Sequence, residues 1–147
     1  MFCLYLYKIV TKQFKSYQVL RLMFTREEMA KQILIIEDDA DILQVLETVL
    51  QYNDFAVKGL SRTDDILQSI SDYKPDLVLT DYLLSGTNGG KICQLIKSNK
   101  DTCHIPVILI SAYPELAASL GNFGFDAFIT KPFDINMLVK RIDDLVY

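Results

Sequence analysis

The sequence predicts an α/β fold built on a doubly wound, five-stranded parallel sheet. Two observations carry this prediction: five short apolar runs bounded by turn or acidic residues, and segments of helical apolar spacing between them. Such runs are typical of strands buried on both faces, and their alternation with helices is typical of parallel sheets with right-handed crossovers. A chain of 147 residues, half of them apolar, is of a size for one folded domain.

The first two strands and two helices are predicted between residues 33 and 73. The run Ile33–Ile36 is rich in β-branched residues and predicts a strand, and apolar residues at helical spacing between 42 and 50 predict the helix that follows it, with Ile42, Val45, Leu46, Val49 and Leu50 as its apolar residues. Phe55–Val57 predicts a second strand. The spacing over 66–73 predicts a helix that ends before the proline at position 75.

The middle of the chain repeats this order. Leu77–Thr80 predicts a third strand that ends at Asp81, and the composition of residues 85–89 is typical of a loop. Apolar residues between 92 and 96 predict a third helix. The run Val107–Ile110 predicts a fourth strand.

The last part of the chain adds two helices and a strand. Residues 116–120 predict a short helix, and 127–129 predict the fifth strand. Asp134 is expected to cap a final helix with an apolar face over 135–145. Asp39 or Asp41 is expected to cap the first helix in the same way.

Residues 1–31 differ from the rest of the chain in charge. They carry six lysine or arginine residues and two glutamates, a net charge of +4, whereas the remainder carries −8. This change predicts an N-terminal extension over 1–31 and a body over 32–147. Three interpretations of the extension stay open: a start assigned too early, since Met29 directly precedes the body, a short docking helix, or a membrane-surface segment.

Composition excludes several classes of protein. The acidic body argues against a nucleic-acid surface, because phosphate binding needs lysine and arginine, and we expect no direct DNA binding. No apolar run approaches the roughly 20 residues of a membrane span. The three cysteines have no paired spacing, so neither a disulfide framework nor a zinc site is expected. A cytoplasmic protein is therefore the expectation.

Charged and hydroxyl side chains follow the predicted strands where these end. They are Glu37 and Asp38 after the first strand, Asp81 after the third, Ser111 after the fourth and Lys131 after the fifth. Ligands of open α/β sheets bind beyond the carboxyl ends of the strands, so these side chains are expected at one edge. Carboxylates grouped there repel one another, and oxygen ligands favour Mg²⁺ or Mn²⁺ over zinc. A metal, an ammonium and a hydroxyl together suit a phosphoryl group, which a carboxylate can accept as a nucleophile.

The motifs ILIIEDD, DLVLTDYLL, PVILISA and AFITKPF occur in this order. Together they resemble the response-regulator receiver domain of two-component signalling, in its stand-alone, chemotaxis-regulator-like form. The resemblance covers residues 32–147 and implies a flavodoxin-like (βα)5 fold. It also implies Mg²⁺ as cofactor, with Mn²⁺ as a substitute.

The resemblance implies a role for each residue that matches a motif. Asp81 corresponds to the phospho-accepting aspartate. Asp38 corresponds to a carboxylate that ligates Mg²⁺, Glu37 to its acidic neighbour, and the backbone carbonyl of Leu83 to a further metal ligand beside Asp81.

Three further matches concern the phosphoryl group and its consequences. Ser111 corresponds to the hydroxyl that hydrogen-bonds the phosphoryl group, and Lys131 to the lysine that pairs with it, before a cis peptide to Pro132. Ser111 and Phe128 correspond to the switch pair that responds to phosphorylation. The implied output face is built by the helix at 116–120, the strand at 127–129 and the helix at 135–145.

The sequence departs from the family pattern at a few positions. Family members often have proline four residues after the acceptor aspartate, where this chain has Ser85, which predicts a looser loop. Phe128 lacks the hydroxyl of a tyrosine. Leu83 and Tyr113 lie at positions where side chains influence the lifetime of the phosphoryl group.

The expected function is that of a stand-alone receiver, since the sequence ends at Tyr147 directly after the last predicted helix. A histidine kinase or histidine phosphotransfer protein would donate the phosphoryl group, and a downstream protein would read the output face. We interpret the chain as a signalling module rather than an enzyme. The alternatives are an aspartyl-phosphate phosphohydrolase, disfavoured because Asp81-Tyr82-Leu83 lacks a second acid, and a receiver-like scaffold that is not phosphorylated.

Overall fold

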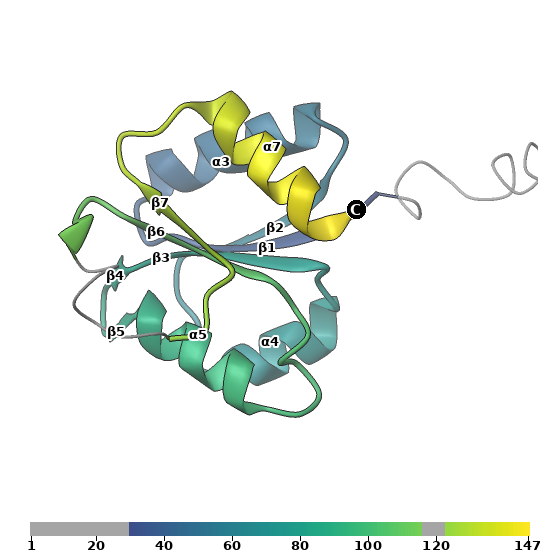
Figure 1. Cartoon of the computed structure of the whole chain (residues 1–147), viewed down its shortest axis with the longest axis vertical. Coiled ribbons are helices and arrows are strands. Elements are labelled where there is room, and N and C mark those ends of the chain that lie inside the picture. Colours follow the sequence, from purple (N-terminus) through teal and green to yellow (C-terminus); the bar gives the residue numbers. More distant parts are fainter. Residues whose placement is uncertain (1–29, 116–122) are drawn as a thin grey trace, which may run out of the picture. The chain divides into compact units, whose positions relative to one another are not determined.

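The computed structural model describes residues 30–115 and 123–147, within two units that comprise residues 1–30 and 31–147. In the second unit, five parallel strands form one sheet in the order β2-β1-β3-β6-β7 (Figure 1). These strands are β1 (Gln32–Ile36), β2 (Ala56–Leu60), β3 (Leu77–Asp81), β6 (Val107–Ser111) and β7 (Ala127–Thr130). The predicted fold class is confirmed. The extension before residue 30 and the whole of the expected helix at 116–120 lie outside the described residues.

Helices cover both faces of this sheet (Figure 1). Helices α3 (Ala40–Tyr52) and α7 (Ile135–Val146) lie on one face, and α4 (Ile66–Tyr73) and α5 (Gly89–Ser98) lie on the other. None of the helices in the described parts of the chain is long and apolar enough to cross a membrane.

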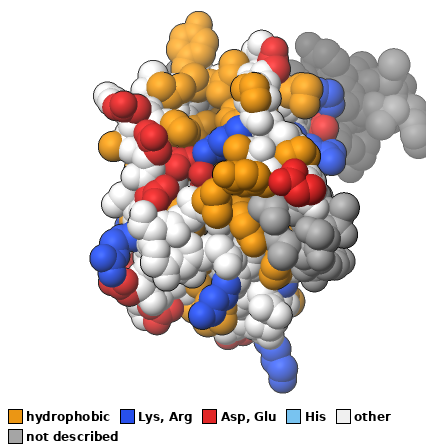
Figure 2. All heavy atoms as spheres, turned by 90° about the vertical axis from the view of Figure 1, so that its left-hand side faces the viewer, with side chains coloured by type: hydrophobic (Ala, Val, Ile, Leu, Met, Phe, Trp, Pro, Cys, Tyr) orange, Lys and Arg blue, Asp and Glu red, His pale blue; other side chains and the backbone are white. Residues whose placement is uncertain are grey.

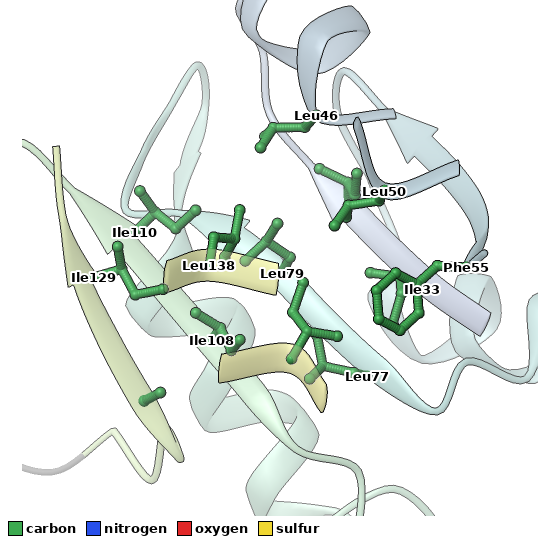
Figure 3. Close-up of a cluster of buried hydrophobic side chains, with 13 residues drawn as sticks. Ile33, Leu46, Leu50, Phe55, Leu77, Leu79, Ile108, Ile110, Ile129 and Leu138 are labelled. Atoms are coloured by element: carbon green, nitrogen blue, oxygen red, sulfur yellow. The ribbon is translucent and has the colours of Figure 1, made fainter. Parts of the chain in front are cut away.

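Strands β1, β2, β3 and β6 contribute to both apolar layers, whereas β7 contributes to one. In β1, Ile33 and Ile35 pack with α3 and α7 in the cluster of Figure 3, whereas Leu34 and Ile36 pack with α4 and α5. Successive side chains of a strand point to opposite faces, so a strand covered on both sides must be apolar at every position. This geometry explains the continuous apolar runs in the sequence.

Side chains cap the described helices at their amino ends. Asp39 accepts hydrogen bonds from the backbone N–H of residues 41 and 42, and Asp134 accepts from those of residues 136 and 137. Both caps were predicted. Asp65 and Asn88 cap α4 and α5 in the same way. Each cap satisfies N–H groups that have no partner within the helix.

Three details differ from the sequence prediction. Strand β2 starts after Phe55 and continues through Lys58, because an edge strand tolerates polar residues that interrupt an apolar run. Val45, expected on the apolar face of the first helix, is 57 % exposed. The expected loop at 85–89 contains the strand β5 (Thr87–Asn88), which pairs antiparallel with β4 (Leu83–Leu84). Gly89, the last residue of that expected loop, is the first residue of α5.

Removing the Leu50 side chain tests the packing of α3 on the sheet. Leu50 is fully buried, so Leu50→Ala leaves a cavity and should lower the free energy of unfolding by about 2–5 kcal/mol. Chemical denaturation followed by circular dichroism measures this. Tyr52→Ala, at a site 88 % exposed on the same helix, is the control and should change stability by less than about 0.5 kcal/mol. Equal effects of the two substitutions would contradict the packing.

Candidate functional site

The register of the sheet brings the polar strand ends together. Ile36 of β1 pairs with Thr80 of β3, Asp81 pairs with Ile110 of β6, and Ser111 pairs with Thr130 of β7. The residues that follow these pairs therefore lie together at the edge of the sheet formed by the carboxyl ends of the strands. Figure 2 shows this edge, where acidic side chains gather beside a basic one.

Lys131 joins two of the predicted site residues. Its ammonium donates to Asp81 Oδ2 at 2.7 Å and to Glu37 Oε2 at 2.9 Å. The backbone N–H of Lys131 donates to the Ser111 carbonyl at 2.8 Å, and the Lys131–Pro132 peptide is cis, as expected. The ammonium therefore lies between carboxylates from two different strand ends.

Burial and neighbouring charges shift the pKa of Glu37 and that of Lys131. Burial raises the pKa of Glu37, which is only 2 % exposed, and the hydrogen bond from Lys131 offsets part of that rise. Burial alone would lower the pKa of Lys131, but the hydrogen bonds to Asp81 and Glu37 outweigh it and raise that pKa. The ammonium is thus held in its charged form beside the two acids.

Asp38 is held by a different partner. Its Oδ2 accepts from the Ser85 hydroxyl at 2.6 Å and from the Ser85 backbone N–H at 2.9 Å. These hydrogen bonds lower the pKa of Asp38, and the bond from the Ser85 hydroxyl has the larger effect. The Asp38 carboxylate thus bonds to the turn between β4 and β5.

The loop after Asp81 approaches that residue closely. The backbone N–H of Leu83 donates to Asp81 Oδ1 at 3.3 Å. A Cβ atom on Gly89 would overlap the carbonyl oxygen of Asp81, so no larger residue fits at the start of α5 without a shift. The Gly89 N–H also donates to the Tyr82 carbonyl at 2.8 Å. These contacts hold the carboxylate and the backbone of Asp81 from the loop that follows it.

The two expected switch residues lie on neighbouring strands. Ser111 is buried at the end of β6, and its hydroxyl accepts from the Tyr113 N–H at 3.1 Å. Phe128 is half-buried on β7, and its ring lies 5.8 Å from that of Phe125, centroid to centroid. The Ser111 hydroxyl thus contacts Tyr113, and the Phe128 ring contacts Phe125.

The sequence matches the response regulator receiver domain over residues 33–143. The chain belongs to this family. The match includes all five strands of the sheet except the first residue of β1, and it confirms the family named from the motifs.

Three relatives show the breadth of the likeness. The chain is 34 % identical to the phosphate regulon transcriptional regulatory protein PhoB of Klebsiella pneumoniae over 78 % of its length and 51 % of that protein. It is 30 % identical to the DNA-binding response regulator MtrA of Mycobacterium bovis over 79 % of its length and 50 % of that protein. The response regulator TrrA of Thermotoga maritima, in complex with Mg²⁺-BeF, shares the fold with a TM-score of 0.71 and 23 % identity, over 78 % of this chain and 98 % of that one.

The receiver spans about half the length of the curated relatives it matches. MtrA is named a DNA-binding regulator, so these relatives give no support to the expectation that the protein has no contact with DNA. Nor do they support the expectation of a stand-alone receiver.

The predicted metal ligands are only partly assembled. In the described part of the chain, no three His, Cys, Asp or Glu side chains are grouped to hold a metal ion. Glu37 and Asp81 share Lys131, whereas Asp38 bonds to Ser85. The oxygen donors still suit Mg²⁺ in kind, and the ligand set stays a prediction.

Sequence reasoning missed the roles of two residues. Ser85 stood out only as a departure from the family pattern, and no local signal links it to Asp38, 47 residues earlier. Gly89 was assigned to a loop. The Gly-Gly pair directly before a helical segment was the signal that could have revealed a close backbone approach.

Replacing Lys131 tests how tightly the folded site holds its proton. Because the folded pKa of Lys131 is raised, this group stabilises the fold fully below its ordinary value of 10.5 and loses that contribution at higher pH. We expect Lys131→Met to lower the free energy of unfolding near neutral pH, and the difference from wild type to shrink above pH 10.5. Urea unfolding at several pH values measures both.

The control for this substitution is Lys140→Met. Lys140 pairs with Asp144 on the exposed side of α7, and surface pairs of this kind contribute little. A difference between wild type and Lys131→Met that stays constant across the alkaline range would contradict the expectation.

Proposed function

We propose that this receiver accepts a phosphoryl group on Asp81 in a two-component phosphorelay. A histidine kinase or a histidine phosphotransfer protein donates the group. A carboxylate oxygen of Asp81 forms the new bond to phosphorus as the bond from phosphorus to the donor nitrogen breaks. The phosphorylated domain then acts on a downstream protein.

One observation carries this proposal: Lys131 Nζ lies 2.7 Å from Asp81 Oδ2. An ammonium at this distance offsets the charge that the phosphoryl oxygens bring to the carboxylate. The Ser111 hydroxyl ends the strand next to β3, where it can donate to the same oxygens once it moves. A phosphoryl group on Asp81 would therefore meet a cation from β7 and a hydroxyl from β6.

Mg²⁺ is the cofactor that we propose. Receiver domains generally bind Mg²⁺ at the acidic site, and here Glu37, Asp38, Asp81 and the Leu83 carbonyl would hold it. The ion would neutralise phosphoryl oxygens during transfer. Mn²⁺ accepts the same oxygen ligands and would substitute for it.

The remaining parts of the proposal concern partners and location. We place the output surface on β7 and α7, together with the helix expected at 116–120, and the donor and target proteins in the cytoplasm. Receiver domains are signalling modules, and we propose no turnover of an external substrate by this chain. PhoB and MtrA are about twice as long as the match, and MtrA is named a DNA-binding response regulator. Output through DNA is therefore an alternative to output through a downstream protein.

Incubation with acetyl phosphate tests the acceptor. Intact-mass spectrometry should show one phosphoryl adduct on wild type in the presence of Mg²⁺ and almost none when Mg²⁺ is chelated. Asp81→Asn should abolish the adduct, because the amide is not a nucleophile towards phosphorus. Asp101→Asn removes an exposed loop carboxylate and is the matched control, which should be labelled as wild type is.

The same measurement separates the alternatives. An unlabelled but folded wild type would favour the scaffold that is not phosphorylated. Steady consumption of acetyl phosphate without a stable adduct would favour the phosphohydrolase. An adduct that survives in Asp81→Asn would show that another residue is the acceptor.

A further inference from the structure

The turn between β4 and β5 carries Ser85 to the edge where the first strand ends. Two donors of this one residue, its hydroxyl at 2.6 Å and its backbone N–H at 2.9 Å, converge on Oδ2 of Asp38. Gly86, with φ of +87°, follows directly and turns the chain back into β5. Hydrogen bonds to an ionised carboxylate are stronger than those between neutral groups.

This contact engages the one predicted carboxylate ligand that Lys131 does not hold. Lys131 donates to Glu37 and to Asp81, whereas Asp38 is half-buried and bonds to Ser85. With Asp38 so held, the described residues contain no group of three acidic side chains placed for a metal ion. The two hydrogen bonds from Ser85 therefore oppose any movement of Asp38 Oδ2 towards Glu37 and Asp81.

We propose that Ser85 is a latch that competes with Mg²⁺ for Asp38, and this proposal rests on the proposed Mg²⁺ site. In the latched state, Ser85 supplies the two hydrogen bonds that the Asp38 oxygen accepts. Binding of Mg²⁺ breaks them, so their free energy is subtracted from that of metal binding. Ser85 is thus a positioning residue that weakens the affinity for Mg²⁺ and leaves the ligand set itself unchanged.

The latch gives a graded response to substitution. Ser85→Ala removes the hydroxyl and keeps the backbone donor, whereas Ser85→Pro removes both donors because proline has no N–H. Ser85→Thr keeps both. Thr87→Val is the matched control, since it removes a hydroxyl from the same hairpin at a position paired with Leu84.

An NMR titration with MgCl₂ measures the latch without any phosphoryl transfer. The backbone amides of Asp38 and Leu83, which every variant retains, report the Kd for Mg²⁺. We expect Ser85→Ala to lower that Kd about threefold to tenfold relative to wild type, the range that the loss of one typical hydrogen bond gives. Ser85→Pro should lower it further, and Ser85→Thr and Thr87→Val should keep the wild-type Kd.

The spectra also show the latch directly. In wild type, the Ser85 amide proton should move upfield as Mg²⁺ saturates the site, because it loses its carboxylate acceptor. The Ser85→Thr variant should repeat this shift at residue 85.

The results that overturn the latch differ from those that overturn the receiver function. An equal Kd in wild type, Ser85→Ala and Ser85→Thr would sink the latch, and a weaker Kd in Ser85→Ala would show that Ser85 assists the metal instead. Mg²⁺ binding to none of the variants would remove both the latch and the proposed cofactor. If Ser85→Pro is unfolded by circular dichroism, the comparison of Ser85→Ala with Ser85→Thr decides the question.

Discussion

The Lys131 ammonium lies between two carboxylates that would otherwise face each other at the end of the sheet. Glu37 is almost completely buried, and a buried carboxylate without a cation nearby is held in its charged form at high cost. The contacts at 2.7 and 2.9 Å relieve this for Asp81 and Glu37 together. The same arrangement keeps a cation beside Asp81, the acceptor that we propose, so the contact that stabilises the folded edge would also suit an incoming phosphoryl group.

This placement depends on the strands being fixed at their opposite ends. Asp76, just before β3, accepts from the Gln32 N–H at the start of β1, and Asp126, just before β7, accepts from the Val107 N–H at the start of β6. Each of these acids also pairs with a lysine, at 3.3 Å for Asp76 and 2.8 Å for Asp126. The same arrangement occurs at two strand pairs, where it joins the start of one strand to the start of its neighbour.

Much of the fold could be predicted because burial on both faces leaves a direct trace in the sequence. The run Ile33–Ile36 has no polar position, and only a strand covered by helices on both sides requires that. Edge strand β2 leaves a weaker trace, since its outer side meets water, and its bounds were predicted wrongly. Val45 was also misplaced, because helical spacing indicates a face but does not say how far the neighbouring elements extend over it.

The site could be predicted where it depends on strand ends and not where it depends on the loop. The sequence places Asp81 and Lys131 at strand ends, and parallel topology then brings them to the same edge. The contact of Ser85 with Asp38 has no such rule behind it, because a turn of the β4–β5 hairpin reaches a residue 47 positions away only through the full three-dimensional path. The site therefore has two kinds of parts. Lys131, Glu37 and Asp81 are fixed by buried strands, whereas Asp38 is half-buried and held by a short hairpin. Asp38 is therefore the predicted metal ligand that can change its partner most easily.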